Sequence, residues 1–198
     1  KIIPRKSIEY IYIYICIYIY IYYFKEFPSF RNKFILSPFG VDTKFWKVDP
    51  AKDKIEGGRI LFIGNDKNRD YKSTIEIAEA CPEYQFTFIT SQVHVKDCPL
   101  NVNLVKGDWG RSILSDCEIR EAYWESSVVM LPIKNTLQPT GQSVALQAMA
   151  CGTPVLMTKT QGLWDPSVMK DGENIYFSDS NEIDVFRKRL QEVVGNHK

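Results

Sequence analysis

The sequence predicts an α/β fold, a Rossmann-like parallel sheet with helices on both faces, over residues 57–198. Two observations lead to this prediction. Short apolar runs rich in Val, Ile and Phe alternate with segments of helical periodicity. The first of these runs ends at a glycine, Gly64, as strands of nucleotide-binding sheets commonly do. Strands separated by helices pair in parallel, and such sheets are covered by helices on both faces.

The first half of this region alternates strand, helix and strand. Residues 59–64 predict a strand, because the continuous apolar run at 60–63 is typical of a buried parallel strand. The segment 71–80 mixes apolar with charged residues and is followed by Pro82, so it predicts a helix with a defined end. Residues 84–90 and 101–105 predict the next two strands because both are rich in β-branched or aromatic residues.

The second half repeats the alternation. Further strands are expected at 127–132, 154–157 and 174–177, and further helices at 117–124, 142–150 and 181–194. Polar segments follow the carboxyl ends of the strands at 65–70, 90–92, 106–110 and 134–143. Ligands of parallel sheets bind at this edge, so the sequence predicts a nucleotide-sized crevice there.

Residues 138–155 contain the most informative motif, a loop of small residues that leads into a helix and then a strand. Gly141 and Ser143 lie at the expected start of the helix, where backbone N–H groups have no partner within the helix. These donors and the positive end of the helix dipole make a site suited to phosphate. Gly152 fits the end of the helix, and Pro154 fits the entry to the next strand.

The end of this motif, Ala-Met-Ala-Cys-Gly-Thr-Pro-Val at 148–155, resembles the donor-binding helix of family 4 (group 1) glycosyltransferases with the GT-B fold. The two carboxylates usual in that family are absent. Gln147 takes the place of the second, and Gln138 or Pro139 lies near the first. A glutamine can still hydrogen-bond a ribose hydroxyl, but it supplies no negative charge at the sugar.

A second segment, residues 34–46, predicts a short strand that ends in a Pro/Gly turn. It resembles the crossover into the second domain of GT-B enzymes, where a Pro-x-Gly-Val-Asp signature followed by Phe is common. A simple linker turn is the alternative. The resemblance therefore covers roughly residues 34–198, the donor half of a two-domain enzyme.

The resemblance also implies site residues. In such enzymes an Arg and a Lys after the first strand of this domain neutralise the donor diphosphate. Asn65 occupies the usual Arg position after Gly64, so Arg69 is the expected cation and Lys72 the second, although Lys72 also fits a solvated first-turn helix residue. The expected donor-binding residues are Gly64, Asn65, Gln138, Thr140, Gly141, Gln142, Ser143, Val144 and Gln147.

The implied reaction is transfer of a sugar from a nucleotide diphosphate sugar to an unknown acceptor, with retained anomeric configuration and with no metal or cofactor. The acceptor domain of GT-B enzymes is separate, and residues 1–30 are too few to form it, so little turnover is expected from these residues alone. A non-catalytic nucleotide-sugar-binding module or a gene fragment is the alternative. A Rossmann oxidoreductase is disfavoured because no Gly-x-Gly-x-x-Gly follows the first strand.

Composition narrows the class of protein further. The chain has 198 residues and a formal net charge of +1, which gives no reason to expect nucleic acid or a membrane surface as a partner. Its five cysteines are odd in number and contain no Cys-x-x-Cys, so reduced thiols and a cytoplasmic location are expected.

The start of the chain departs from this ordinary composition. Residues 9–24 are almost entirely alternating Ile and Tyr. The run fits a strand, a rather short membrane helix, or the translation of an alternating T and A repeat in DNA. We expect three regions, a low-complexity segment at 1–24 outside the folded core, a linker or crossover at 25–56, and the nucleotide-sugar-binding domain at 57–198.

Overall fold

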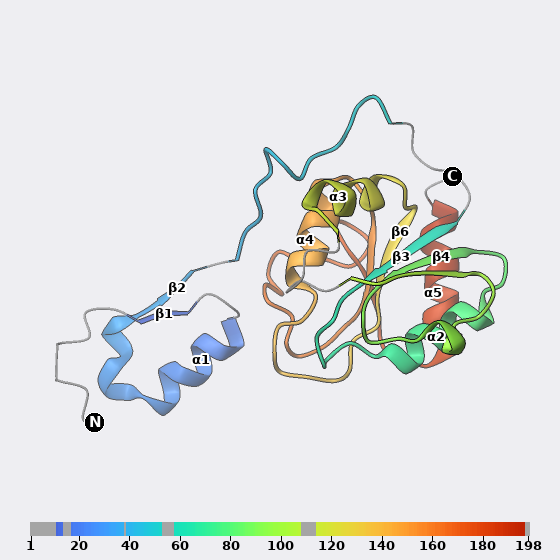
Figure 1. Cartoon of the computed structure of the whole chain (residues 1–198). Coiled ribbons are helices and arrows are strands. Elements are labelled where there is room, and N and C mark those ends of the chain that lie inside the picture. Colours follow the sequence, from blue (N-terminus) through green and yellow to red (C-terminus); the bar gives the residue numbers. More distant parts are fainter. Residues whose placement is uncertain (1–10, 14–16, 38, 53–57, 108–113, 197–198) are drawn as a thin grey trace, which may run out of the picture.

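The computed structural model describes residues 11–13, 17–37, 39–52, 58–107 and 114–196. Residues 58–196 form a sheet with helices on both faces, which we call the sheet domain (Figure 1). Each strand and helix expected in this region is present, with ends within two residues of the prediction. The described residues between 11 and 36 form a small separate set of elements, which we call the N-terminal segment.

Six parallel strands make the sheet, in the order β5-β4-β3-β6-β7-β8. Their bounds are Arg59–Ile63 for β3, Gln85–Ile89 for β4, Val102–Val105 for β5, Val128–Leu131 for β6, Val155–Thr158 for β7 and Tyr176–Ser178 for β8. The chain starts at the centre with β3, moves outward to β5 and returns to β6 on the other side of β3. The reversal between β3 and β6 is the topological switch point, where doubly wound sheets bind their ligands.

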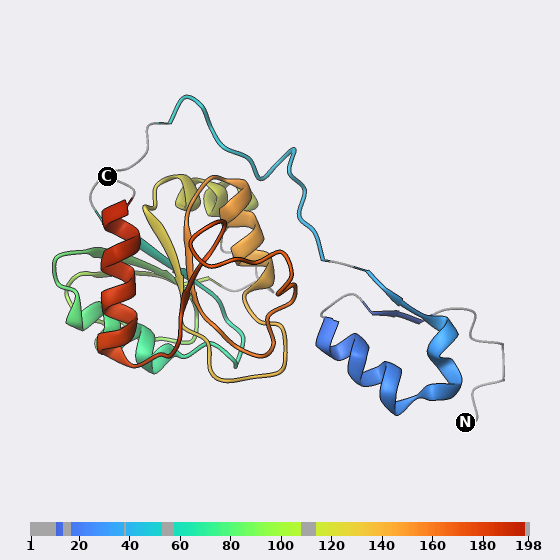
Figure 2. The ribbon, with the colours of Figure 1, turned by 180° about the vertical axis from the view of Figure 1, so that it is seen from behind.

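Two layers of helices cover the sheet. The helices are α2 (Tyr71–Ala80), α3 (Asp116–Trp124), α4 (Gln142–Ala150) and α5 (Ile183–Asn196), with a short 3-10 helix η2 at Val95–Asp97. One hydrophobic cluster joins residues of α2 and α5 to one face, and another joins residues of α3 and α4 to the opposite face. Figure 2, seen from behind, shows α5 lying across the sheet.

Strand β3 shows why both layers are needed. Its side chains alternate, so Ile60 and Phe62 pack in the cluster of α2 and α5, whereas Leu61 and Ile63 pack in the cluster of α3 and α4. All four are buried. A run without polar residues is therefore the expected pattern for a central strand that is covered on both sides.

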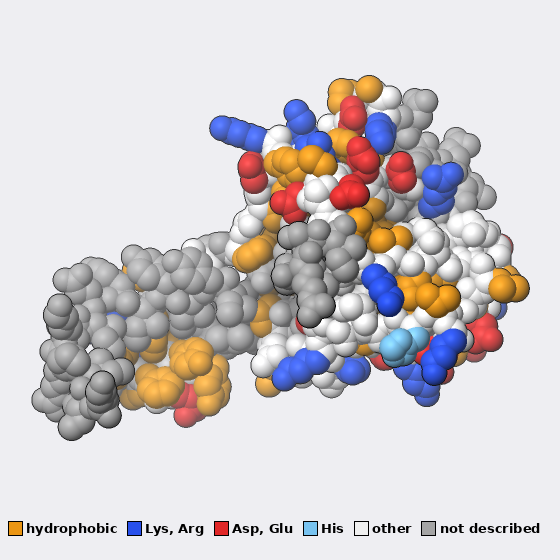
Figure 3. Space-filling model, viewed as in Figure 1, with side chains coloured by type: hydrophobic (Ala, Val, Ile, Leu, Met, Phe, Trp, Pro, Cys, Tyr) orange, Lys and Arg blue, Asp and Glu red, His pale blue; other side chains and the backbone are white. Residues whose placement is uncertain are grey.

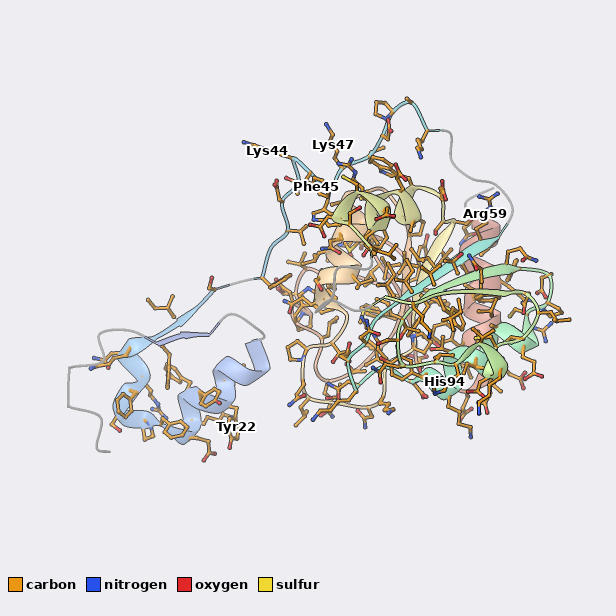
Figure 4. All side chains as sticks on the ribbon, viewed as in Figure 1. Tyr22, Lys44, Phe45, Lys47, Arg59 and His94 are labelled. Atoms are coloured by element: carbon orange, nitrogen blue, oxygen red, sulfur yellow. The ribbon has the colours of Figure 1, made fainter. Side chains whose placement is uncertain are left out.

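The expected crossover segment is anchored on the sheet domain. Trp46 is only 7% exposed and belongs to the same cluster as α3 and α4. The guanidinium of Arg120 lies 4.3 Å from the centre of the Phe45 ring, and its Nη1 donates to the Phe45 carbonyl at 3.0 Å. Trp124 Nε1 donates to the Lys47 carbonyl at 2.9 Å. Figure 4 shows Phe45 and Lys47 beside α3. These residues thus extend the core.

The N-terminal segment combines a strand pair and a helix. Strand β1 (Ile11–Ile13) pairs in parallel with β2 (Phe34–Leu36), and the elements between them are α1 (Ile17–Glu26) and the 3-10 helix η1 (Pro28–Lys33). The Ile/Tyr run is therefore a strand in one part and a helix in another, while residues 1–10 and 14–16 of the expected low-complexity segment lie outside the described residues.

Large apolar side chains remain on the surface of the N-terminal segment. Ile21, Tyr22, Tyr23 and Phe27 are exposed, and Figure 3 shows the orange patch that such side chains make there. Among the described helices, α1 included, none combines the length and the apolar character that crossing a bilayer requires.

Candidate functional site

Two loops meet at the switch point of the sheet. Residues 64–70 lead from β3 to α2, and residues 132–141 lead from β6 to α4. Arg69 and Ile133 form an isolated antiparallel bridge between the loops. The Lys134 N–H donates to the Asn68 carbonyl at 2.9 Å, and the Asp70 N–H donates to the Pro132 carbonyl at 3.0 Å. The two loops are therefore fixed relative to each other at the edge where a ligand is expected.

Arg69 is the central side chain of this junction. It is 2% exposed, although arginine is seldom buried unless it is paired. A Cβ atom on Gly64 would overlap with Arg69 Nε, and one on Gly141 would lie 2.6 Å from Nη1. The guanidinium thus occupies space that two glycines leave open, one after β3 and one at the start of α4.

The buried guanidinium is incompletely paired. Its Nε lies 3.3 Å from Asp66 Oδ2, yet Nε and Nη1 form no hydrogen bond. Burial lowers the pKa of Arg69, and the carboxylate of Asp66 works against that shift. The group keeps its charge, because arginine does not deprotonate in proteins. A buried cation with unsatisfied N–H groups is uncommon and calls for an anionic partner.

The start of α4 lies against the same guanidinium. Gly141 is the N-cap residue, with a φ of 80° that favours glycine, and it offers no side chain to cap the helix. By contrast, α2 is capped by Asp70, and α3 has a capping box formed by Ser115 and Glu118. The positive end of the α4 dipole and the charge of Arg69 therefore converge at Gly141.

Asn68, which the sequence analysis did not single out, connects the two loops. Its Nδ2 donates to Gln138 Oε1 at 3.3 Å and to Thr140 Oγ1 at 3.1 Å. Gln138 is exposed and Thr140 is buried. The structure thus brings two of the expected donor-binding residues together through an amide whose type and position in the loop gave no distinctive sequence signal.

Asn65 has a structural role at the same edge. Its Oδ1 accepts from Thr90 Oγ1 at 3.0 Å and from the N–H and hydroxyl of Ser91 at 2.7 and 3.0 Å. Its Nδ2 donates to the Gly107 carbonyl at 2.6 Å. One amide thereby joins the loops that follow β3, β4 and β5.

A second polar network supports the junction from the side of α5. Asn181 Nδ2 donates to Asp70 Oδ2 at 2.9 Å and to the Ile133 carbonyl at 2.8 Å, and its Oδ1 accepts from Thr158. Partial burial works to raise the pKa of Asp70, but hydrogen bonds from Ser73 and Asn181 outweigh it and hold that pKa below its usual value. This network fixes both the start of α2 and the end of β6.

Gln147 lies half-buried on α4 and is oriented by α3. Its Oε1 accepts from the Tyr123 hydroxyl at 3.0 Å. Burial raises the pKa of Tyr123, so the phenol keeps its proton and needs an acceptor. The amide carbonyl of Gln147 is therefore directed to Tyr123, which leaves its NH₂ group as the donor for another partner.

The remaining expected residues fall into two places. Gln142 and Ser143 are half-buried in the first turn of α4, and Val144 after them is buried in the core. Lys72 is elsewhere, because its side chain is 83% exposed on α2 and pairs with Glu76 at 3.6 Å. Among the described residues, no group of three or more His, Cys, Asp and Glu side chains has the arrangement of a metal site.

Comparison with known proteins agrees with this architecture. Residues 57–196 match the sequence profile of the family described as glycosyl transferases group 1. No curated protein sequence matches the chain.

Solved structures of glycosyltransferases have the same fold. HepE from Anabaena, solved with UDP-glucose, has a TM-score of 0.64 and 14% identity over 83% of this chain and 49% of its own. The C-terminal domain of LpcC from Francisella tularensis has a TM-score of 0.58 and 20% identity over 79% and 88%. A glycosyltransferase from Rickettsia africae has a TM-score of 0.70 and 9% identity over 95% and 54%. The chain spans about half the length of HepE and of the Rickettsia protein.

Proposed function

This chain belongs to the group 1 glycosyl transferases, and its sheet domain has the fold of one Rossmann-like half of a GT-B enzyme. From that premise we propose that the sheet domain binds a nucleotide diphosphate sugar, whose glycosyl group is then transferred to an acceptor. One observation carries the proposal. The buried guanidinium of Arg69 has two nitrogen atoms without a hydrogen bond, and it lies against the start of α4, which no side chain caps, at the switch point of the sheet.

The donor diphosphate lies over the start of α4 in this proposal. Backbone N–H groups in the region of Gly141, Gln142, Ser143 and Val144 and the helix dipole face the phosphates, and Arg69 supplies a full charge from below. Departure of the nucleoside diphosphate leaves negative charge on the β-phosphate, and groups already in place stabilise that charge without reorganising. No metal is required for this role.

The nucleoside and the sugar contact different side chains. The NH₂ group of Gln147, oriented by Tyr123, donates to a ribose hydroxyl. Gln138 and Thr140, held by Asn68, lie in the loop that faces the donor sugar. HepE has been solved in complex with UDP and glucose, which supports the same class of donor for this chain.

The stereochemistry of transfer and the cellular compartment are further parts of the same proposal. Resemblance to the family supports transfer with retention of the anomeric configuration, which NMR of the product anomeric proton tests. A reducing, cytoplasmic compartment is supported by the thiols of Cys81, Cys98, Cys117 and Cys151, all of which are free in the described part of the chain. In this proposal the sheet domain binds the donor and a second domain of the GT-B type binds the acceptor, so we expect the sheet domain alone to turn the donor over poorly.

Calorimetric titration with UDP, GDP, ADP, NAD and uridine tests the donor site. We expect a nucleoside diphosphate to bind and NAD to bind weakly or not at all. Removal of Arg69 by Arg69→Ala should weaken the diphosphate by roughly 10- to 100-fold, because hydrogen bonds to a charged group contribute about 1.5–3 kcal/mol. The nucleoside should be little affected. Lys96→Ala, which removes a cation from the exposed surface of η2, is the control.

Two other variants assign the remaining contacts. Gln147→Ala should weaken UDP and uridine by a similar factor, because the ribose is common to both and one such hydrogen bond contributes about 0.5–1.5 kcal/mol. If Lys72→Ala abolished diphosphate binding and Arg69→Ala did not, the phosphate-binding cation would be Lys72. If neither change mattered, the site would lie elsewhere in the chain. Donor binding with no transfer in the presence of an acceptor domain would favour a non-catalytic binding module.

A further inference from the structure

We propose that Asp66 is an internal competitor of the donor, an anion that occupies Arg69 while the site is empty and yields the guanidinium to the diphosphate. The proposal rests on the proposed function, since it concerns how tightly the same site holds its ligand. It assigns to Asp66 a role in setting affinity and not a contact with the donor.

The ion pair between Asp66 and Arg69 involves only one side of the guanidinium. Asp66 Oδ2 lies 3.3 Å from Arg69 Nε, whereas Nη1 on the other side of the guanidinium has no hydrogen-bond partner. A bidentate carboxylate would satisfy two nitrogen atoms at shorter distances. The observed pair therefore reduces the cost of burying the charge without saturating its donors.

The two partners differ in their access to water. The Asp66 side chain is 44% exposed, while Arg69 is 2% exposed and enclosed by Gly64 and Gly141. A carboxylate that already faces water can turn outward at low cost, but the enclosed guanidinium has little room to move. Exchange therefore proceeds by rotation of Asp66 into solvent and approach of a phosphate to Arg69.

Hydrogen bonds to the backbone carbonyl of Asp66 hold this residue in place independently of its ion pair. Its carbonyl accepts from the Tyr71 hydroxyl at 2.8 Å and from the Arg69 N–H at 3.3 Å. Its Oδ1 accepts from the Asn68 N–H at 3.0 Å. The two bonds to the Asp66 carbonyl remain when the carboxylate turns outward and gives up the Asn68 N–H, and the Asn68 side chain continues to connect the loop to Gln138 and Thr140.

Asp66 has two opposite effects on the protein. In the empty chain it compensates a buried charge, and loss of that compensation destabilises the fold. In the bound chain it places a negative charge near the phosphates, which repels the ligand. A residue that merely positions Arg69 would behave differently, because its loss would weaken both the fold and the binding. The signs of the two effects therefore separate the alternatives.

The variant Asp66→Asn tests the proposal in the full 198-residue chain. It keeps the acceptor for the Asn68 N–H and removes only the charge. We expect UDP to bind roughly tenfold more tightly, as removal of a partly screened charge near a diphosphate predicts, with uridine unchanged. The melting temperature without ligand should fall. Asp97→Asn removes the same charge from the exposed helix η2 and should change neither quantity.

A double variant shows whether the effect passes through Arg69. In the Arg69→Ala background, Asp66→Asn should raise UDP affinity clearly less than it does in the native background, because no guanidinium remains for Asp66 to occupy and only the repulsion of the phosphates is removed. If Asp66→Asn does not fold, NMR of the native chain tests the proposal instead. Its Arg69 Nε–H resonance must shift when UDP is added, since the guanidinium changes partner.

The outcomes distinguish this proposal from the one on which it rests. UDP binding that depends on Arg69 but is equal or weaker in Asp66→Asn would overturn the role of Asp66 and leave the donor site standing. An Arg69 Nε–H resonance unmoved at saturating UDP would do the same. Absence of binding by UDP, GDP and ADP to the native chain would overturn both.

Discussion

The sheet domain and the N-terminal segment are both rich in Ile and aromatic residues, but among the aromatic side chains described in the N-terminal segment only Phe34 is buried. Phe62 in β3 is fully buried between the sheet and the layer of α2 and α5. Tyr22 in α1 is 59% exposed, and neither of the two core clusters includes a described residue of the N-terminal segment. Apolar sequence becomes core only where a second layer with its own apolar face covers it.

In both regions an arginine stacks on a phenylalanine ring and donates to the carbonyl of the same residue, so the two environments can be compared directly. Arg31 lies over the Phe24 ring at 5.1 Å and donates to the Phe24 carbonyl at 2.8 Å. Arg120 makes the same two contacts with Phe45, at 4.3 and 3.0 Å. Arg31 is exposed, whereas Arg120 is half-buried and anchors a segment that contains the buried Trp46. The two contacts with phenylalanine match, but Arg120 also lies 4.6 Å from the centre of the Trp124 ring.

The largest difference in stability between the two regions is expected when one phenylalanine in each is replaced by alanine. Phe62→Ala should cost about 3–5 kcal/mol of unfolding free energy, because it leaves a cavity beside Tyr71 and Phe88. Phe27→Ala, on the exposed side chain, should cost less than about 1 kcal/mol. Urea unfolding measures both, and Phe62→Leu provides a milder change if the alanine variant does not fold. Equal costs would show that the N-terminal segment has a core of its own.

The next largest effect concerns the glycine at the candidate site. Gly141→Ala should cost about 2–4 kcal/mol, because the residue has a positive φ and its new Cβ would press on Arg69 Nη1. Gly172 also has a positive φ, of 75°, but nothing lies within 4 Å of its Cβ position. Gly172→Ala should therefore cost only the backbone part, about 1–2 kcal/mol. Thermal unfolding of both variants separates close packing from backbone strain, and UDP affinity should fall only in Gly141→Ala.

The same contrast explains what the sequence predicted well. Strand β3 was predicted from a continuous apolar run that ends at Gly64, and helix α4 from the loop of small residues before it and from Gly152 after it. The Ile/Tyr run has period two over a length that suits a strand, yet part of it is helical, since both faces are equally apolar and the pattern selects neither state.

The sequence predicted where the candidate site lies, but not which side chains contact one another there. The glycine-rich start of α4 and the order of strands indicated the edge of the sheet, and Arg69 lies there. The burial of Arg69 and the bridging role of Asn68 depend on the approach of two loops about 70 positions apart in the chain, whereas the ion pair of Arg69 with Asp66 lies within one loop. Contacts between distant loops leave no local periodicity in the sequence. Lys72 is exposed because of the side of α2 on which it lies.

Replacing Arg120 and Arg31, the two arginines that stack on phenylalanine rings, gives a matched test with a smaller expected effect on stability. Arg120→Ala should cost about 1–2 kcal/mol, because a partly desolvated cation–π contact and a hydrogen bond are lost together. Arg31→Ala should cost less than about 0.5 kcal/mol, since water replaces both contacts. Limited trypsin digestion adds a local readout. Cleavage after Lys44 and Lys47, which Figure 4 labels, should accelerate in Arg120→Ala and not in Arg31→Ala. Equal digestion rates would show that Trp46 alone holds the segment.

The smallest effect is expected when residues 1–24 are deleted. The described part of this stretch adds no residue to either core cluster, and the Tyr23 ring packs on Tyr22, Phe27 and Phe34, all of the same segment. The melting temperature of the sheet domain should therefore stay within a few degrees, and solubility should improve because an uncharged Ile/Tyr run that favours β-aggregation is gone. Deletion of residues 1–47 also removes Phe45 and Trp46, so it should lower the melting temperature clearly. A collapse of folding already in the shorter deletion would mean that the run supports the sheet domain, and the distinction between the two regions would then be wrong.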